Sequence, residues 1–302
     1  MRKAFWLLAV LVVACDQPAP PAGNGSCRLP ISIADSQGNS QGVFVSFPSG
    51  KVTLDATGVG GVYYDRPFAR WLPVNGNSVS SDGARYAYLD RKVPGTPGRA
   101  RLHLVDVRTG TEKLVELGAP EDTSAYVVVS FTPEGIWLSQ AGYESPNGGL
   151  YLLEAGTAVL KDMGGPGIFE PVAGAPGVFW FTDGGPVPQQ SAGMGSIIQA
   201  RMQRLTISDG KTETWLSEPG SYLTVLGTDL VGQPIFTDGN NVRLALSPSE
   251  AKVIGLPQGY HQLTSDSHGV WFGGQQGIFL FSDANGLKKV SNQPGYPVNG
   301  CF

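Results

Sequence analysis

The sequence predicts an all-β fold built from one antiparallel unit that recurs along the chain, and two patterns support this prediction. The first pattern is a strand–turn–strand hairpin, whose six copies begin at Gly42, Arg101, Gly149, Met202, Asn241 and Gly277. The second pattern is a turn joined to an apolar run, which precedes five of these copies in the segments SSDGARYAY, TPEGIWLS, GAPGVFWFTDG, LVGQPIFTDG and DSHGVWFGG. Together the two patterns make a unit of four strands.

The clearest copy of this unit occupies residues 80–117. Residues 84–88 alternate with the period of two of a half-buried strand, Leu102 and Leu104 continue the alternation, and a turn at residues 108–110 leads into a last strand. The 275 residues from 28 to 302 give about 46 residues for each of six units, close to the ~40–45 of propeller blades. We therefore predict a six-bladed β-propeller of four-stranded antiparallel blades.

The six blades follow one another along the chain. The first has only three strands near the N-terminus, at residues 29–35 and within 42–55, so we expect residues 296–302 to supply its fourth strand. The other blades are predicted at residues 70–117, 123–162, 169–218, 222–255 and 260–292. The two ends of the domain therefore meet in one blade, and this closure removes the open sheet edges of the ring.

Composition agrees with one β domain over residues 28–302. The 42 glycines and 23 prolines suit a chain with many turns, and a charged content of only 15% suits a rigid exported domain. The formal net charge is -4, and loss of Arg2 and Lys3 would leave 19 basic against 25 acidic residues, or -6. No basic tract occurs, so we expect no nucleic-acid partner, and we expect a monomer.

The N-terminal residues have the pattern of an export signal. Residues 1–3 are basic and residues 4–14 are an apolar run, which is too short to span a bilayer as a helix. Residues 12–15 (Val-Val-Ala-Cys) resemble the bacterial lipobox. That resemblance implies cleavage of a signal peptide at residues 1–14 and diacylation of the Cys15 sulfur, for example by palmitate. Residues 15–27 would form a Pro/Gly-rich tether, and the protein would be a membrane-anchored lipoprotein on the periplasmic or extracellular side of the cell envelope.

The chain has three cysteines, and an odd number in an exported protein requires an explanation. If Cys15 carries lipid, Cys27 and Cys301 remain at the two ends of the propeller. Because the ends of the ring meet in one blade, a disulfide between Cys27 and Cys301 would close it. The alternatives are an ordinary cleaved signal with an incidental thiol at Cys15, and two unpaired thiols in the tails.

Loop lengths distinguish the two faces of the predicted disc. Loops between second and third strands are long in three consecutive blades, at residues 91–100, 142–148 and 184–200, and the connection at residues 56–68 opens on the same side. We call this side the loop-rich face and the other the short-turn face. Long loops on a rigid scaffold commonly bind partners. The expected binding residues are Tyr63, Tyr64, Arg66, Arg91, Arg99, Tyr143, Glu144, Gln189 and Gln190, with Asp65, Phe68, Lys92 and Met194 beside them. The alternative is a set of solvated loops whose aromatic residues pack on their neighbours.

Few residues suit catalysis. His103 lies between Leu102 and Leu104 and is expected to be structural, whereas His261, Asp266 and His268 could form a weak acid/base or metal site near the channel. We expect no metal and no cofactor. The Asp-Gly pairs are turn signals, and no calcium loop, phosphate loop or serine nucleophile elbow occurs.

Two segments resemble known propeller repeats. SSDGARYAYLD followed by RLHLVDVRTG resembles the WD-type repeat of TolB-like propellers, and HGVWFGGQQGIFLFSDANG resembles the repeats of regulator-type and virginiamycin B lyase-like propellers. These resemblances imply a propeller fold but no particular activity. The function that we expect is binding of another envelope protein or an extracellular polymer through the loop-rich face. The alternative is a metal-assisted lyase or lactonase at the channel.

Overall fold

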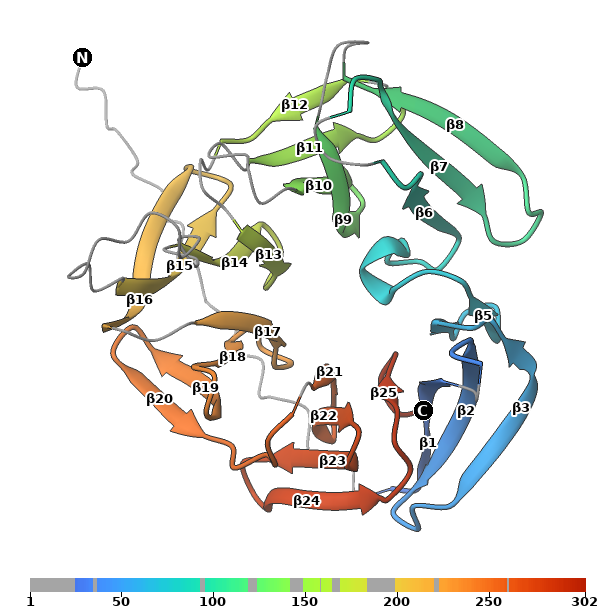
Figure 1. The fold of residues 1–302 in the computed structure, drawn as a ribbon, viewed down its shortest axis with the longest axis vertical. Coiled ribbons are helices and arrows are strands. Elements are labelled where there is room, and N and C mark those ends of the chain that lie inside the picture. The colour runs from blue at the N-terminus through green and yellow to red at the C-terminus, as the bar shows by residue number, and fades with distance from the viewer. Residues whose placement is uncertain are drawn as a thin grey trace, which may run out of the picture.

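The computed structural model describes residues 25–34, 37–92, 96–118, 124–141, 149–157, 159–164, 169–183, 199–219, 223–259 and 261–302. In this part of the chain the regular structure is β-strand, apart from one turn of 3-10 helix, η1 (Gly76–Ser78). The sheets surround a central axis as the blades of a propeller (Figure 1). The predicted fold class is therefore confirmed. Among the described residues, no helix is long and apolar enough to cross a membrane.

The first three blades contain the following strands, from the axis outward. Blade 1 consists of β25 (Tyr296–Pro297), β1 (Cys27–Ala34), β2 (Ser40–Phe47) and β3 (Val52–Val59). Blade 2 contains β6 (Arg85–Leu89), β7 (Ala100–Asp106) and β8 (Glu112–Leu117). Blade 3 consists of β9 (Ala125–Thr132), β10 (Gly135–Ala141), β11 (Leu150–Glu154) and β12 (Leu160–Asp162).

The last three blades are regular four-stranded meanders. Blade 4 consists of β13 (Phe169–Ala173), β14 (Val178–Asp183), β15 (Gln199–Thr206) and β16 (Lys211–Pro219). Blade 5 consists of β17 (Thr224–Thr228), β18 (Pro234–Thr237), β19 (Val242–Ser247) and β20 (Glu250–Val253). Blade 6 consists of β21 (Gln262–Asp266), β22 (Gly269–Gly274), β23 (Gly277–Ser282) and β24 (Gly286–Ser291).

The ring closes in blade 1, where the predicted C-terminal strand is present. β25 pairs with β1, with Pro297 opposite Ile31, and it lies on the inner side of the blade (Figure 1). A disulfide joins Cys27 to Cys301, whose Cα atoms are 5.6 Å apart. This pairing confirms the predicted disulfide.

Apolar side chains fill the spaces between neighbouring blades. Successive residues of a strand point to opposite faces of its sheet. In β22, Trp271 is fully buried against Leu29 of blade 1, whereas Val270 and Phe272 pack with Ile235 of blade 5. Because both faces of such a strand are covered, its sequence is apolar at every position, and this explains the runs that mark the second strand of each blade.

Blade 2 departs from the regular pattern at its inner edge. Residues 70–72, which were expected to begin this blade, form β5 (Arg70–Leu72) and pair instead with β4 (Tyr63–Asp65) in a separate hairpin. The inner position of blade 2 contains η1 and a single bridge between Val79 and Tyr86. Gly76 allows this turn, because a Cβ at this position would come within 2.7 Å of the Tyr63 ring. The shortened inner strand leaves space between blades 2 and 3.

Candidate binding site on the loop-rich face

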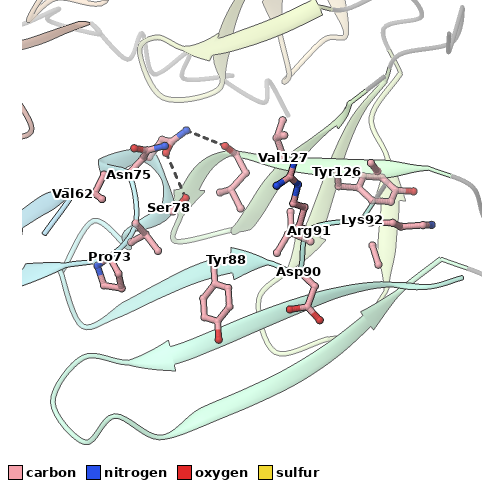
Figure 2. Close-up of a pocket in the computed structure, with 16 residues that line it drawn as sticks. Val62, Pro73, Asn75, Ser78, Tyr88, Asp90, Arg91, Lys92, Tyr126 and Val127 are labelled. Carbon is pink, nitrogen blue, oxygen red and sulfur yellow. Dashed lines mark hydrogen bonds between the residues drawn. The ribbon is translucent and has the colours of Figure 1, made fainter. Parts of the chain in front are cut away.

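A cavity of about 570 Å³ lies between blades 2 and 3 (Figure 2). We call it the blade 2–3 cavity. Residues 73–78, which replace the inner strand of blade 2, form one wall, and residues 125–128 of β9 form the opposite wall. The end of β6 and the start of the loop that follows it, at residues 88–92, also line the cavity, together with Val62 and Ala100. Since that loop joins the second and third strands of the blade, the cavity opens on the loop-rich face.

The η1 wall is fixed by hydrogen bonds. The Asn77 side-chain amide donates to the carbonyl of Val128 at 2.9 Å and so joins blade 2 directly to β9. The Ser78 hydroxyl is 3.5 Å from the amide oxygen of Asn77. Ser78 is buried, whereas Asn75 and Asn77 are exposed at the surface of the wall. The polar wall therefore has a defined position before any partner binds.

The opposite wall is apolar and aromatic. Val127 of the inner strand β9 is 47% exposed. Tyr126 beside it is partly buried, and its ring packs edge to face on Tyr151 with centroids 5.6 Å apart. An exposed valine next to a supported tyrosine is typical of a protein or ligand contact surface.

Two cations stand at the mouth of the cavity. The Lys92 ammonium donates to the carbonyl of Gly98 within its own loop. Arg91 is exposed, and none of the described residues forms a hydrogen bond or ion pair with its guanidinium (Figure 2). An arginine guanidinium carries five N–H donors and binds carboxylates with two parallel hydrogen bonds. Arg91 therefore offers an unused donor group to an acidic partner.

The neighbouring carboxylate, Asp90, does not neutralise Arg91, because it is paired elsewhere. His103 of β7 lies 3.0 Å from Asp90 through Nε2 and also contacts Glu112 through Nδ1. The hydrogen bond to Glu112 raises the pKa of the His103 imidazole above its ordinary value, and Asp90 acts in the same direction. The Tyr88 ring stacks on the imidazole with a centroid distance of 4.4 Å. This cluster pairs the Asp90 carboxylate with His103.

The expected binding residues divide into four groups, of which the residues of the 56–68 connection form the last. Arg91 and Lys92 line the cavity, as part of the predicted loop-rich face. Arg99 is half exposed and forms an ion pair with Glu116 of β8 at 2.9 Å, so its guanidinium already has an acidic partner. The remaining loop residues, Tyr143, Glu144, Gln189, Gln190 and Met194, lie outside the described residues, as does the expected lipidation site Cys15.

The expected position of the 56–68 connection was wrong for its aromatic and charged residues. Tyr64 is buried and stacks on Phe302 with centroids 5.4 Å apart, and the Arg66 guanidinium lies 5.3 Å from the same ring. Arg70 at the tip of the hairpin donates to the carbonyl of Val107, in the turn between β7 and β8. The hairpin therefore carries Tyr64 and Arg66 to the short-turn face, where the chain ends meet.

Two further residues of this hairpin, Tyr63 and Asp65, also make internal contacts. Tyr63 accepts a hydrogen bond from Asn299 at 2.9 Å and packs with the core beneath blade 2. Asp65 is buried, one of its carboxylate oxygens has no partner among the described residues, and burial raises the pKa of its carboxyl. The turn at residues 66–69 pairs β4 with β5, and Tyr63 and Tyr64 of β4 pack in the core instead of extending into a loop.

The three candidate catalytic residues do not form one site. His261 is buried, with Nε2 2.7 Å from the carbonyl of Pro257. Asp266 and His268 contact each other at 3.1 Å. His261 precedes β21 and Asp266 ends it, and five extended residues at ~3.3 Å each separate them by roughly 16 Å. Across the described residues, no group of three His, Cys, Asp or Glu side chains could hold a metal ion.

Sequence reasoning missed the residues around Arg91. Tyr88 and His103 pair directly across β6 and β7, and Glu112 lies on the next strand. The period-two alternation places Tyr86 and Tyr88 on one face of β6, so the sequence indicates the orientation of Tyr88. It does not indicate that His103 and Glu112 lie beside Tyr88. The register between β6 and β7 depends on a ten-residue loop, and no local pattern fixes it.

The chain matches no protein-family model and no curated protein sequence. Three solved structures illustrate its similarity to known folds. An oligogalacturonate lyase in complex with manganese is 11% identical, with a TM-score of 0.55 over 87% of this chain and 86% of that one. TolB from Acinetobacter baumannii is 14% identical, with a TM-score of 0.45 over 87% of this chain and 65% of that one. Dipeptidyl peptidase 4 from Porphyromonas gingivalis is 12% identical, with a TM-score of 0.42 over 85% and 42% of the two chains.

At such identities the similarity concerns the fold alone. The chain spans less than two thirds of the TolB and dipeptidyl peptidase structures, whereas it spans most of the oligogalacturonate lyase. A shared scaffold does not transfer a site, because propellers with unrelated functions use the same blades. The chain therefore shares its overall fold with the oligogalacturonate lyase.

Proposed function

We propose that the protein is a lipid-anchored propeller of the cell envelope that binds another envelope protein or an extracellular polymer through the loop-rich face. The blade 2–3 cavity is the centre of this surface. The observation that carries the proposal is Arg91, an exposed guanidinium without a partner among the described residues, at the mouth of a cavity with a fixed polar wall and an exposed apolar wall.

The chemistry of the cavity favours an acidic group on the partner. Arg91 and Lys92 supply two positive charges, while the nearest carboxylate, Asp90, is paired with His103. Arginine and tyrosine are also the residue types that contribute most to protein interfaces. A partner would place a carboxylate on Arg91 and an apolar or sugar face against the exposed side chain of Val127.

The membrane anchor is the second part of the proposal. It rests on the signal-like residues 1–14, the lipobox-like residues 12–15 and the Pro/Gly-rich tether that ends at Cys27, where β1 begins. Growth of the expressing bacterium with radiolabelled palmitate tests it. We expect the intact protein to take up label and Cys15→Ser to take up none. Equal labelling of both proteins would remove the anchor from the proposal.

The enzymatic alternative, a metal-assisted lyase or lactonase, has less support. It required His261, Asp266 and His268 to act together, but these residues lie at opposite ends of β21. His261 is bonded to a backbone carbonyl, and Asp266 and His268 face the disulfide. The described residues therefore favour binding over catalysis at the channel.

A capture experiment tests the proposed binding. The full-length protein in detergent is immobilised and exposed to solubilised envelope, next to Arg91→Ala and to a control, Arg108→Ala, which changes the same residue type at the opposite end of blade 2. We expect one partner to be captured by the native protein and by Arg108→Ala, and to be lost with Arg91→Ala. Equal capture by all three proteins would contradict the role of the cavity.

A further inference from the structure

A partly buried histidine and aspartate lie directly beside the disulfide that closes the ring. His268 Nε2 is 3.7 Å from Sγ of Cys27, and His268 Nδ1 is 3.1 Å from Oδ1 of Asp266. The side chains of His268 and Asp266 are only 10% and 11% exposed. The sequence placed these residues in two unrelated roles, a channel site and a structural disulfide, and the fold brings them together.

Asp266 is held rigidly by four hydrogen bonds. One oxygen accepts from the His268 backbone N–H at 2.7 Å as well as from the ring, and the other accepts from Trp271 Nε1 at 2.8 Å and from the Cys301 backbone N–H. Gly300 permits this approach, because a Cβ there would come within 2.9 Å of the Asp266 Cβ. The carboxylate therefore binds both the histidine and the peptide of one disulfide cysteine.

This arrangement selects one tautomer of the neutral imidazole. A carboxylate that accepts from Nδ1–H leaves the lone pair on Nε2. In this structure Nε2 faces Sγ of Cys27. The ring is also fixed from the sides, since Phe47 and Trp271 pack against it with centroids 5.7 and 6.1 Å away. The other charged group next to Cys27 is Arg28, which lies over the Phe44 ring and adds no negative charge.

We propose that the Cys27–Cys301 disulfide is a reversible thiol–disulfide exchange site, in which Asp266 and His268 stabilise the Cys27 thiolate. A cysteine beside a histidine that a carboxylate orients is the arrangement that converts a thiol to a thiolate. A thiolate that is stabilised in this way is the better leaving group of the pair. The pairing of the chain ends would then depend on the redox state of their surroundings.

The exchange needs an external reductant that supplies two thiol groups. Its first thiolate attacks Sγ of Cys301, the S–S bond breaks, and the electron pair remains on Sγ of Cys27, opposite Nε2 of His268. Its second thiolate then attacks the mixed disulfide and releases Cys301. The reductant loses two electrons and two protons and leaves as a disulfide. The two cysteines gain the two electrons, one proton resides on His268 beside the Cys27 thiolate, and the other resides on Sγ of Cys301 as a thiol.

Site-resolved alkylation of the full chain tests the thiolate directly. In Cys301→Ser, the rate at which iodoacetamide modifies Cys27 is measured against pH by mass spectrometry of the digested protein, after circular dichroism has confirmed the β fold. We expect a midpoint below the ordinary cysteine value of about 8.5. Adding His268→Phe, which keeps an aromatic ring between Phe47 and Trp271, should return the midpoint to the ordinary value or above it. The same low midpoint with and without His268 would overturn the proposal.

A second measurement keeps both cysteines. The native protein, His268→Phe and His268→Gln are equilibrated with glutathione redox buffers, and the reduced fraction is quantified. Loss of one pKa unit of thiolate stabilisation corresponds to about a tenfold change in equilibrium constant, so both variants should be roughly tenfold harder to reduce. His261→Gln is the matched control, because glutamine can still donate to Pro257 and lies at the far end of β21. Equal reduced fractions in all four proteins would mean that the disulfide is only structural.

Discussion

On the short-turn face, carboxylates accept hydrogen bonds from their own turns, whereas on the loop-rich face Arg91 has no described partner. Asp106 accepts from the backbone and hydroxyl of Thr109, and Asp229 accepts from the backbone of Val231 and Gln233. A short turn satisfies its polar groups internally and has little left for a partner. The longer loop after β6 leaves Arg91 without a partner among the described residues, and for this reason we propose recognition on this face and a structural role for the other.

The largest expected effect concerns the closure of the ring on the short-turn face. Cys301→Ser removes a crosslink between residues separated by 274 positions. The entropy of the unfolded chain then rises, and the free energy of unfolding should fall by about 5 kcal/mol. Chemical denaturation of the native protein and of the variant, both without added reductant, measures this loss. Coincident unfolding curves would show that the seam is held by strand pairing alone.

The next effect contrasts a buried residue of the seam with an exposed residue of the cavity. Trp271 is completely buried between blades 6 and 1, so Trp271→Ala should cost about 3–5 kcal/mol. Val127 is 47% exposed on the cavity wall, and Val127→Ala should change stability by less than about 0.5 kcal/mol. Thermal or denaturant unfolding gives both values. A large loss at Val127 would mean that the cavity wall supports the fold rather than a partner.

A smaller effect is a pH dependence that arises beside the cavity. The raised pKa of His103 means that its stabilising contribution is complete below the unfolded value of 6.5 and disappears as pH rises through the folded value. Asp106 has the opposite sign: its lowered pKa stabilises the fold above the ordinary value of 3.8, and this contribution is lost as pH falls through the folded value. His103→Gln should therefore flatten the stability profile above pH 6.5 and leave the acid limb unchanged. Denaturation across this range measures it, and an unaltered profile would exclude the His103 cluster as its source.

The regular parts of the fold could be predicted because they depend on repeated local signals. The turn and apolar run before each hairpin identified the blades, and the shortage of strands near the N-terminus placed the last strand beside Ile31. The hairpin at β4 and β5 was missed because Arg70–Leu72 has the alternation of an inner blade strand, and only tertiary packing pairs it with Tyr63–Asp65. The disulfide followed from the closed ring, but the position of His268 beside it did not.

The candidate site was predictable only as a region. Loop length pointed to the strand that ends near Arg91, since long loops on a scaffold carry binding groups. The wall opposite this residue comes from a different blade, and nothing in the sequence around Val127 indicates that its side chain is exposed. The loss of the inner strand at Gly76, which creates the cavity, depends on the close approach of Tyr63. The cavity and the exposure of Val127 therefore depend on contacts between segments that are distant in the sequence.

The most direct test of the central claim uses Arg91 with the partner that the capture experiment identifies. Arg91→Ala removes an exposed side chain that makes no described contact, so its unfolding curve should match that of the native protein. Titration calorimetry should nevertheless show affinity reduced by about tenfold or more, as for a loss of at least ~1.4 kcal/mol at an arginine hot spot, while Arg108→Ala binds normally. Unchanged affinity of a folded Arg91→Ala protein would contradict recognition at the blade 2–3 cavity.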